Sequence, residues 1–356
     1  MSFDPLAPPP FSTADLPGIG GRIKTEPEDF EVEEIPAYQP CGQGEHIFLW
    51  VEKRAMGAEF FVRQIARRLD LHPGEVGTAG LKDRHAVTRQ MVSVPAAAEA
   101  KVGQIDGDGI RVLSVSRHTN KLRPGHLHGN RFRVRLRDVV PAAAERLSQL
   151  LTRLRGNGWP NFYGPQRFGR EGETVKLGLR MLAPEAEESS LRVRNPFLRK
   201  LALSAAQSAV FNHYLSLRVR DGLLRRVLPG DVMAKYPFGG LFVAEDIARE
   251  QERLEARETV PAGPIVGRKT FAASGEAASR EATAVADTGI ATAALTRFGK
   301  LLPGTRRHNL VYADDLTGTV ELNSAQLAFS LTAGSYATVL LREITKIETL
   351  DAGDPA

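Results

Sequence analysis

Residues 130–137 alternate strictly between basic and apolar side chains and read Asn-Arg-Phe-Arg-Val-Arg-Leu-Arg. Successive side chains of a β-strand point to opposite faces, so this period of two predicts a strand with one apolar and one basic face. Four arginines on one face repel one another unless opposite charge lies nearby. Carboxylates on neighbouring strands and the phosphates of a bound polyanion would each supply that charge, and both interpretations stay open from the sequence.

Other segments show either this period of two or the spacing of an amphipathic helix. Alternation in residues 21–53, at positions 30, 32, 47, 49 and 51, predicts paired strands. Residues 58–70 change to helical spacing, with an apolar stripe at Phe61, Ile65 and Leu69. Further strands are predicted at 90–94 and in the tail from residue 306, and further helices at 141–157, 198–220 and 244–258.

Length and composition limit the class of protein. The chain has 356 residues, enough for two domains, and its composition changes at the aromatic and proline-rich segment that begins at Trp159. No apolar run approaches the roughly 20 residues of a membrane span. The proline-rich residues 1–17 predict a frayed arm and no signal peptide. The single cysteine, Cys41, excludes an internal disulfide and a cysteine-cluster metal site; we expect a small filler side chain in a protein of the reducing cytoplasm.

Positive charge is concentrated in one part of the chain. The net charge is +5, and residues 117–137 contain seven Lys or Arg and no Asp or Glu. Such a one-signed block is expected of a protein that binds a polyanion, although solvated basic faces also occur without a ligand.

Residues 77–89, GTAGLKDRHAVTR, place one acidic residue, Asp83, among cations. Glycines at 77 and 80 let the backbone bend close to a ligand. A carboxylate in this basic setting suits a nucleophile or base that works on an anionic substrate, and the alternative is a charged surface turn. Two other motifs give weaker evidence for a site than the Asp83 segment. The pair His126-x-His128 has no third metal ligand in register. Residues 263–270 match a phosphate-binding loop in neither spacing nor order. The residues by themselves therefore indicate no metal site and no phosphate-binding loop.

Six segments together resemble the TruD family of tRNA pseudouridine synthases over nearly the whole chain. They are Lys24-x-x-Pro-Glu-Asp-Phe30, Gly42-x-Gly-Glu-His46, residues 79–88 (AGLKDRHAVT), Gly129-Asn130-x-Phe132, residues 161–169 (NFYGPQRFG) and residues 333–338 (AGSYAT). Each is weak alone, but six in the family's order are specific. One departure is Tyr336, where some members carry Phe; the aromatic face is retained.

The resemblance implies an enzyme of tRNA processing, an isomerase that converts a uridine in tRNA, position 13 in bacterial members, to pseudouridine without a metal or cofactor. It implies that Asp83 is the nucleophile, attacking the ribose C1′ or the uracil C6 or assisting proton loss from the sugar. A cation must keep this carboxylate charged in a closed site. Lys24 is the first candidate for that activating cation, and Arg84 is the second if the segment is a turn.

The resemblance also implies substrate contacts. Phe30, Phe132 and Tyr336 would stack on a flipped-out uridine, and Asn130 would hydrogen-bond the uracil or the ribose. We expect Phe132 at the rim of the site, with a core position as the alternative. The basic side chains expected on the RNA backbone are Arg117, Lys121, Arg123, Arg131 and Arg133.

The fold implied is α+β, with a mixed, largely antiparallel sheet of pseudouridine-synthase type flanked by helices, and a second α/β insertion domain. Residues 1–158 and 305–356 would form a discontinuous catalytic domain, and residues 159–304 the insertion domain. We expect a cytoplasmic monomer whose partner is tRNA, without a protein partner or a membrane. The alternative function is a non-catalytic RNA-binding or tRNA-folding protein. A glycoside or nucleoside hydrolase is disfavoured, because such sites usually need a second carboxylate.

Overall fold

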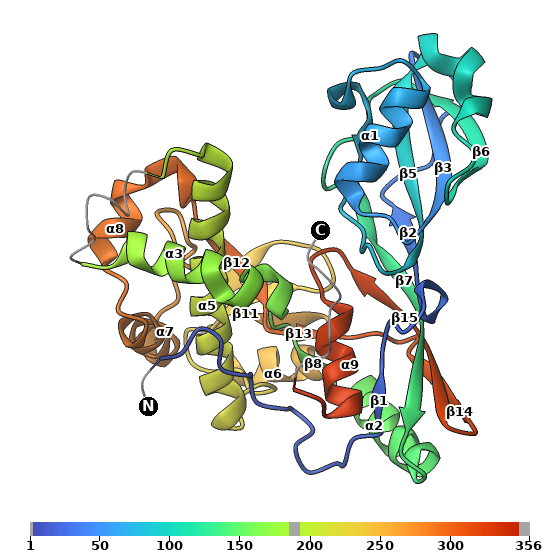
Figure 1. Ribbon diagram of the computed structural model, residues 1–356. Coiled ribbons are helices and arrows are strands. Elements are labelled where there is room, and N and C mark those ends of the chain that lie inside the picture. Colours follow the sequence, from blue (N-terminus) through green and yellow to red (C-terminus); the bar gives the residue numbers. More distant parts are fainter. Residues whose placement is uncertain (1–2, 185–192, 349–356) are drawn as a thin grey trace. The chain divides into compact units, whose positions relative to one another are not determined.

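The computed structural model describes residues 3–184 and 193–348 (Figure 1). These residues form two compact units. The sheet unit comprises residues 16–155, 313–337 and 344–348, and the α5 unit comprises residues 3–15, 156–184, 193–312 and 338–343. Each unit is described by itself below.

The sheet unit is built on one mixed sheet with the order β14-β15-β7-β2-β5-β3-β6, to which β1 adds beside β7 and β4 beside β5. Only the pairing of β2 with β5 is parallel among these strands. The strands are β1 Gly20–Arg22, β2 Phe30–Pro36, β3 His46–Arg54, β4 Gly77–Thr78, β5 Val87–Pro95, β6 Ile110–His118, β7 Leu127–Val139, β14 Thr317–Glu321 and β15 Ser324–Thr332. The helices are α1 Ala58–Arg68, α2 Ala143–Asn157, α9 Ala337–Thr345 and the 3₁₀ segments η1 Pro27–Asp29, η2 Pro73–Glu75 and η3 Ala96–Gln104; the last residues of α2 and most of α9 fall in the α5 unit.

The alternating strand of residues 130–137 lies within β7. Its apolar side chains, Phe132, Val134 and Leu136, are buried, while Arg131, Arg133 and Arg135 are exposed. The prediction that residues 21–53 contain two paired strands was wrong in one respect. Both strands form, but β5 lies between β2 and β3. Alternation reports which face of a strand is buried and carries no information about its neighbour.

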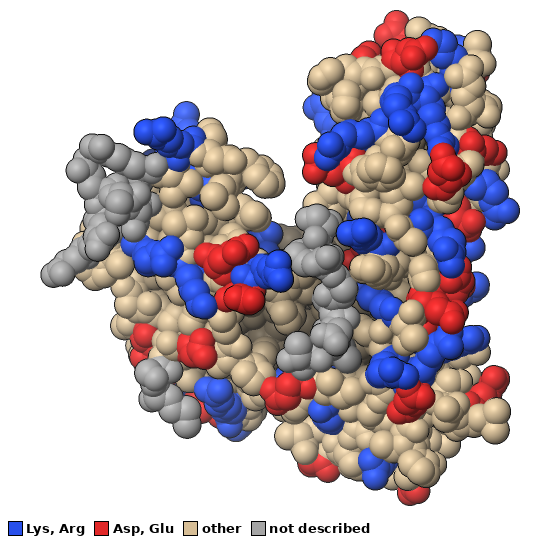
Figure 2. All heavy atoms as spheres, in the orientation of Figure 1, with Lys and Arg blue, Asp and Glu red and all other residues tan. Residues whose placement is uncertain are grey.

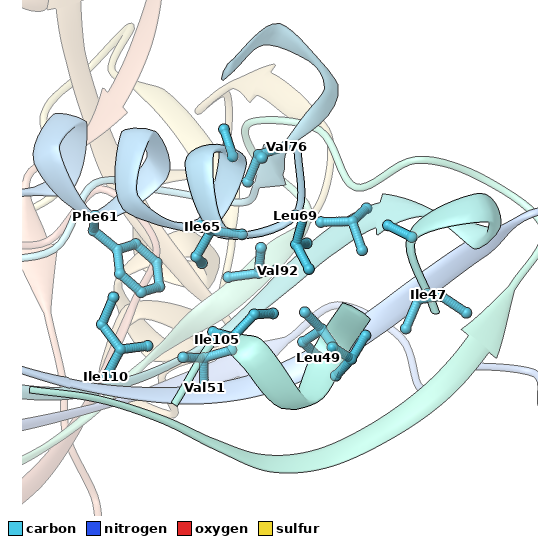
Figure 3. Packing of buried hydrophobic residues seen from close by; sticks show 14 of the residues in the cluster. Ile47, Leu49, Val51, Phe61, Ile65, Leu69, Val76, Val92, Ile105 and Ile110 are labelled. Atoms are coloured by element: carbon cyan, nitrogen blue, oxygen red, sulfur yellow. The ribbon is translucent and has the colours of Figure 1, made fainter. Parts of the chain in front are cut away.

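Helix α1 covers one face of the sheet with the stripe expected from the sequence. Figure 3 shows Phe61, Ile65 and Leu69 above Val51 and Val92. All five side chains are at most 2% exposed. Burial of one such side chain contributes about 1.5–3 kcal/mol, so this layer holds α1 on the strands.

The α5 unit surrounds a long helix, α5 Pro196–Arg220, whose N-cap Asn195 accepts from the backbone of Phe197 and Leu198. Its short sheet has the order β10-β9-β11-β12, and a separate pair joins β13 to β8. The remaining elements are β8 Trp159–Pro160, β9 Val232–Lys235, β10 Leu241–Val243, β11 Thr259–Ile265, β12 Thr305–His308, β13 Leu310–Val311, α3 Glu173–Leu182, α6 Ile247–Glu255, α7 Gly275–Asp287, α8 Thr292–Arg297 and the 3₁₀ segments η4 Pro165–Arg167, η5 Arg170–Gly172 and η6 Gly299–Leu301.

The units differ at their edges from the expected domains. Residues 305–312 belong to the α5 unit because β12 pairs with β11 and β13 pairs with β8. Residues 3–15 also belong to it, so the prediction of a frayed arm was wrong for this segment: the Phe3 ring meets His213 at 5.2 Å, and the Phe11 ring lies 3.8 Å below the Arg342 guanidinium.

Two further sequence expectations concern the surface. Cys41, expected to be a small filler, is exposed. Among the described residues, no helix has the length and apolar character needed to cross a membrane.

Candidate active site

The loop that carries Asp83 connects β4 to β5 in the sheet unit and has no regular secondary structure. The Asp83 side chain is 51% exposed, which is more open than the closed site expected from the sequence. One carboxylate oxygen, Oδ2, lies 3.3 Å from the Lys24 ammonium. The structure therefore brings together the two residues expected to be the nucleophile and its activating cation.

Lys24 is held from two sides. Its side chain is only 6% exposed, and its Nζ lies 4.5 Å from the centre of the Phe30 ring. Its backbone has a φ of 55°, in the left-handed region that non-glycine residues rarely adopt and that stores about 1–2 kcal/mol of strain. The position of the Lys24 ammonium is therefore fixed by its burial, by the Phe30 ring and by the Asp83 carboxylate.

Lys82, although adjacent to Asp83 in sequence, points into the protein. Its Nζ lies 2.7 Å from Oε2 of Glu34, and both side chains are at most 3% exposed. The second oxygen of Glu34 accepts from the backbone N–H of Met91 at 3.3 Å. Arg84 is exposed. This buried ion pair ties the Asp83 loop to β2 and β5, and among the described residues it leaves Lys24 as the cation paired with the Asp83 carboxylate.

Lys53 on β3 was missed by the sequence analysis. It is fully buried, and its Nζ donates to the backbone oxygens of Met56, Asp83 (3.0 Å) and Lys82 (3.5 Å). Burial lowers the pKa of Lys53 to about 8, against the opposing pull of the Asp83 charge. A signal for it was present: Ile47, Leu49 and Val51 mark the buried face of this strand, and position 53 continues that period.

Three aromatic side chains form a floor beneath Lys24, whose ammonium lies over the Phe30 ring. Phe132 is 7% exposed and lies between two rings, Phe30 at 5.9 Å edge-on and Phe329 at 5.2 Å stacked. Phe30 itself is fully buried. The expected rim position of Phe132 was wrong, because packing between two neighbouring strands places this ring in the core.

Asn130 lies near the start of β7, and Tyr336 directly precedes α9. In the sheet register, Asn130 stands between Glu34 on β2 and Leu331 on β15. Its side-chain oxygen Oδ1 is buried, and none of the described residues donates to it. A buried acceptor without a partner is rare in folded proteins. Tyr336 is half-buried.

The exposed arginines of β7 lie on the face of the sheet opposite to Phe132. Directly paired residues share a face, and Arg131 and Arg133 pair with Glu33 and Glu31, whereas Phe132 pairs with Val32. Arg131 Nη1 lies 2.6 Å from Glu33 Oε1, and Arg137 lies 2.9 Å from Asp29. For these two arginines the structure selects the carboxylate alternative. Figure 2 shows acidic side chains interspersed with basic ones over this unit.

The other predicted RNA contacts have varied surroundings. Arg117 pairs with Glu99, and Lys121 Nζ donates to the backbone oxygen of Gly74. The side chains of Arg123 and Arg133 make no ion pair with any described residue. His126 Nδ1 lies 2.8 Å from the Tyr38 hydroxyl, and no metal-binding cluster of His, Cys, Asp and Glu is found among the described residues.

Comparison with known proteins agrees with the sequence motifs. A family model described as tRNA pseudouridine synthase D (TruD) matches residues 11–190 and 179–344. The tRNA pseudouridine synthase D of Anaeromyxobacter dehalogenans strain 2CP-C is 44% identical over 340 residues, covering 95% of this chain and 97% of that protein. A Thermus thermophilus protein of the same name is 39% identical over 343 residues, covering 96% of this chain and 93% of that protein.

A solved structure shares the fold. It is the crystal structure of a Methanosarcina mazei protein that carries the name tRNA pseudouridine synthase D (TruD), with a TM-score of 0.75 and 24% identity over 96% of this chain and 97% of that chain. The expected α+β fold with a mixed, largely antiparallel sheet is confirmed.

Proposed function

The chain belongs to the TruD family of tRNA pseudouridine synthases and is an isomerase of uridine in tRNA, and on that premise we propose that it acts on uridine 13 with Asp83 as the nucleophile. The observation that carries this assignment is the contact of 3.3 Å between the Asp83 carboxylate and the buried Lys24. A carboxylate that is accessible on one side and paired with a fixed cation on the other is ready to meet a developing positive centre.

The isomerisation breaks the bond between uracil N1 and ribose C1′, forms the bond between C5 and C1′, and moves the C5 proton to solvent while N1 gains one. No atom is lost and no electron is transferred to another molecule. As the N1–C1′ bond lengthens, positive character develops on the sugar, and an ionised carboxylate stabilises or captures it. Attack at C1′, attack at C6 and assisted proton loss from the sugar all remain routes open to Asp83.

In this proposal Lys24 keeps Asp83 ionised when the nucleotide covers it. Desolvation favours the protonated carboxyl group, and a cation within about 4–6 Å opposes that shift. The Phe30 ring under Lys24 holds the ammonium in place from below.

The proposed substrate contacts follow from the surroundings of the loop. Asn130 Oδ1 accepts from uracil N3–H or a ribose hydroxyl, because it has no donor among the described residues. Tyr336 stacks on the everted base, and Phe30 and Phe132 support the site from beneath. The remaining contacts, Arg117, Lys121, Arg123, Arg131 and Arg133, are proposed to meet RNA phosphates, with Arg123 and Arg133 the strongest because they make no ion pair with described residues.

The proposal also covers the roles of the two units, the oligomeric state and the cellular location. Because the nucleophile, its cation and the floor lie in the sheet unit, we assign catalysis to this unit and an insertion-domain role to the α5 unit. A monomer is proposed as well, and a cytoplasmic location is proposed because the substrate is tRNA.

The test is Asp83→Asn, with wild-type protein and Asp106→Asn as the matched control; Asp106 is an exposed carboxylate of the same unit. Each protein is incubated with unmodified tRNA transcripts, and pseudouridine is mapped at nucleotide resolution. We expect Asp83→Asn to abolish product at uridine 13 while tRNA affinity stays within about tenfold, and Asp106→Asn to remain active. Normal turnover by Asp83→Asn would refute the nucleophile assignment. Binding without product by the wild-type protein would favour the RNA-binding alternative.

A further inference from the structure

Leu81 is the most accessible apolar side chain near Asp83. It is 81% exposed and lies two residues before Asp83 on the same loop. Exposure alternates along this stretch: Leu81 is exposed, Lys82 is 5% exposed, and Asp83 is exposed again. Leu81 and Asp83 therefore project to the accessible side of the loop, while Lys82 projects into the protein.

The main chain under Leu81 is fixed. The ammonium of Lys82 lies 2.7 Å from buried Glu34, and the ammonium of Lys53 donates to the backbone oxygen of Asp83 at 3.0 Å. These contacts hold the backbone on both sides of the peptide that joins residues 82 and 83. Because the backbone is held by these contacts, we expect Leu81 to keep its position when a ligand binds against it.

Single exposed leucines are common and usually need no explanation. The same unit contains one: Leu322, in the turn between β14 and β15, is fully exposed. Leu81 differs because it is attached to the loop of the proposed nucleophile and belongs to none of the hydrophobic clusters formed by the described residues. On the function proposed above, an apolar side chain that projects beside Asp83 faces the nucleotide on which Asp83 acts.

We propose that Leu81 enters the base stack of the tRNA where the target uridine leaves it, and so holds that nucleotide everted toward Asp83. This inference rests on the function proposed above. An everted base leaves the apolar faces of its neighbours uncovered, and branched apolar side chains inserted between base steps cover such faces in other nucleic-acid complexes. Leu81 is a positioning residue, because it holds the nucleotide in place. Asp83 takes part in breaking the glycosidic bond.

The experiment separates eversion from chemistry. A tRNA transcript carries 2-aminopurine next to uridine 13, so that its fluorescence rises when the stack opens, and turnover is measured on unlabelled tRNA. The variants are Leu81→Ala, Leu81→Met and Leu322→Ala, each also combined with Asp83→Asn to record eversion without product.

We expect Leu81→Ala to lose most of the fluorescence rise and to lower turnover by about tenfold or more, because alanine no longer covers the base faces that eversion exposes. Leu81→Met keeps an apolar side chain and retains both signals, and Leu322→Ala behaves as wild type. A full fluorescence rise with Leu81→Ala overturns the proposal, whether turnover is normal or reduced. If Asp83→Asn stays active, the nucleophile assignment fails, while the fluorescence comparison still decides the role of Leu81.

Discussion

Lys53→Met tests whether a buried lysine supports the Asp83 loop at the expense of stability. The pKa of this lysine is 10.5 in its ordinary setting and about 8 in the folded chain. Between these values the unfolded chain binds more protons at this residue than the folded chain, so the free energy of unfolding rises with pH across that range. Below pH 8 the group is charged in both states and the destabilisation is complete.

The magnitude follows from the size of the shift. One pKa unit corresponds to about 1.4 kcal/mol, so the drop from 10.5 to about 8 destabilises the folded protein by about 3 kcal/mol at neutral pH. Between pH 7 and pH 10 about 2–3 kcal/mol of this is regained. The charges that act on Lys53 are Asp83, which attracts it, and Lys82, which repels it.

The assay is urea unfolding of wild type and Lys53→Met at several pH values between 7 and 10 and constant ionic strength. Fluorescence of Trp50, with Trp159 replaced by Phe, reports the sheet unit. Groups common to both proteins cancel in the difference. Lys101→Met removes a lysine that is 43% exposed in the same unit and controls for net charge.

We expect the unfolding free energy of wild type minus that of Lys53→Met to rise by about 2–3 kcal/mol from pH 7 to pH 10. Lys53→Met should also turn over more slowly, because the backbone oxygens of Met56, Lys82 and Asp83 lose their donor. Curves for the two proteins that stay parallel with pH would refute the reasoning.

Three further outcomes are expected. Lys24→Met should lower single-turnover rates by about a hundredfold with tRNA affinity nearly unchanged, and equal losses in both would place Lys24 in binding instead. Lys82→Met should destabilise the protein by about 3–5 kcal/mol in urea unfolding because it leaves Glu34 buried and unpaired, and the double variant Lys82→Met/Glu34→Leu should recover most of this; failure to recover would contradict the role of the pair. Arg123→Ala should flatten the dependence of log Kd on log salt by about one unit and Arg131→Ala by less, because Arg131 already pairs with Glu33; equal slopes would show that this ion pair does not matter.

Several features were predictable because they depend on local backbone geometry. The period of two in residues 130–137 predicted both the strand and its buried face, and the stripe of Phe61, Ile65 and Leu69 predicted α1 to within two residues. The Asp83 motif needed no tertiary information either, since its residues are adjacent.

The rest was decided by contacts between distant residues. Lys24 reaches Asp83 across 59 positions of sequence, and Glu34 reaches Lys82 across 48. The order of the strands brings these residue pairs together. No pattern within β2 or β3 reveals that β5 lies between the two strands. Lys82 is ordinary in the sequence, and Lys53 only continues the buried period of β3. Both can be buried because each finds oxygen partners that only the folded sheet supplies.

The amino-acid sequence by itself predicted the strand at residues 130–137 with its buried face, helix α1 and the family. The tertiary structure alone decided which cation pairs with the Asp83 carboxylate, that β5 lies between β2 and β3, and which carboxylates pair with Arg131 and Arg137. The physical reason is range: backbone periodicity extends over a few residues, whereas burial and ion pairing depend on which segments become neighbours in space.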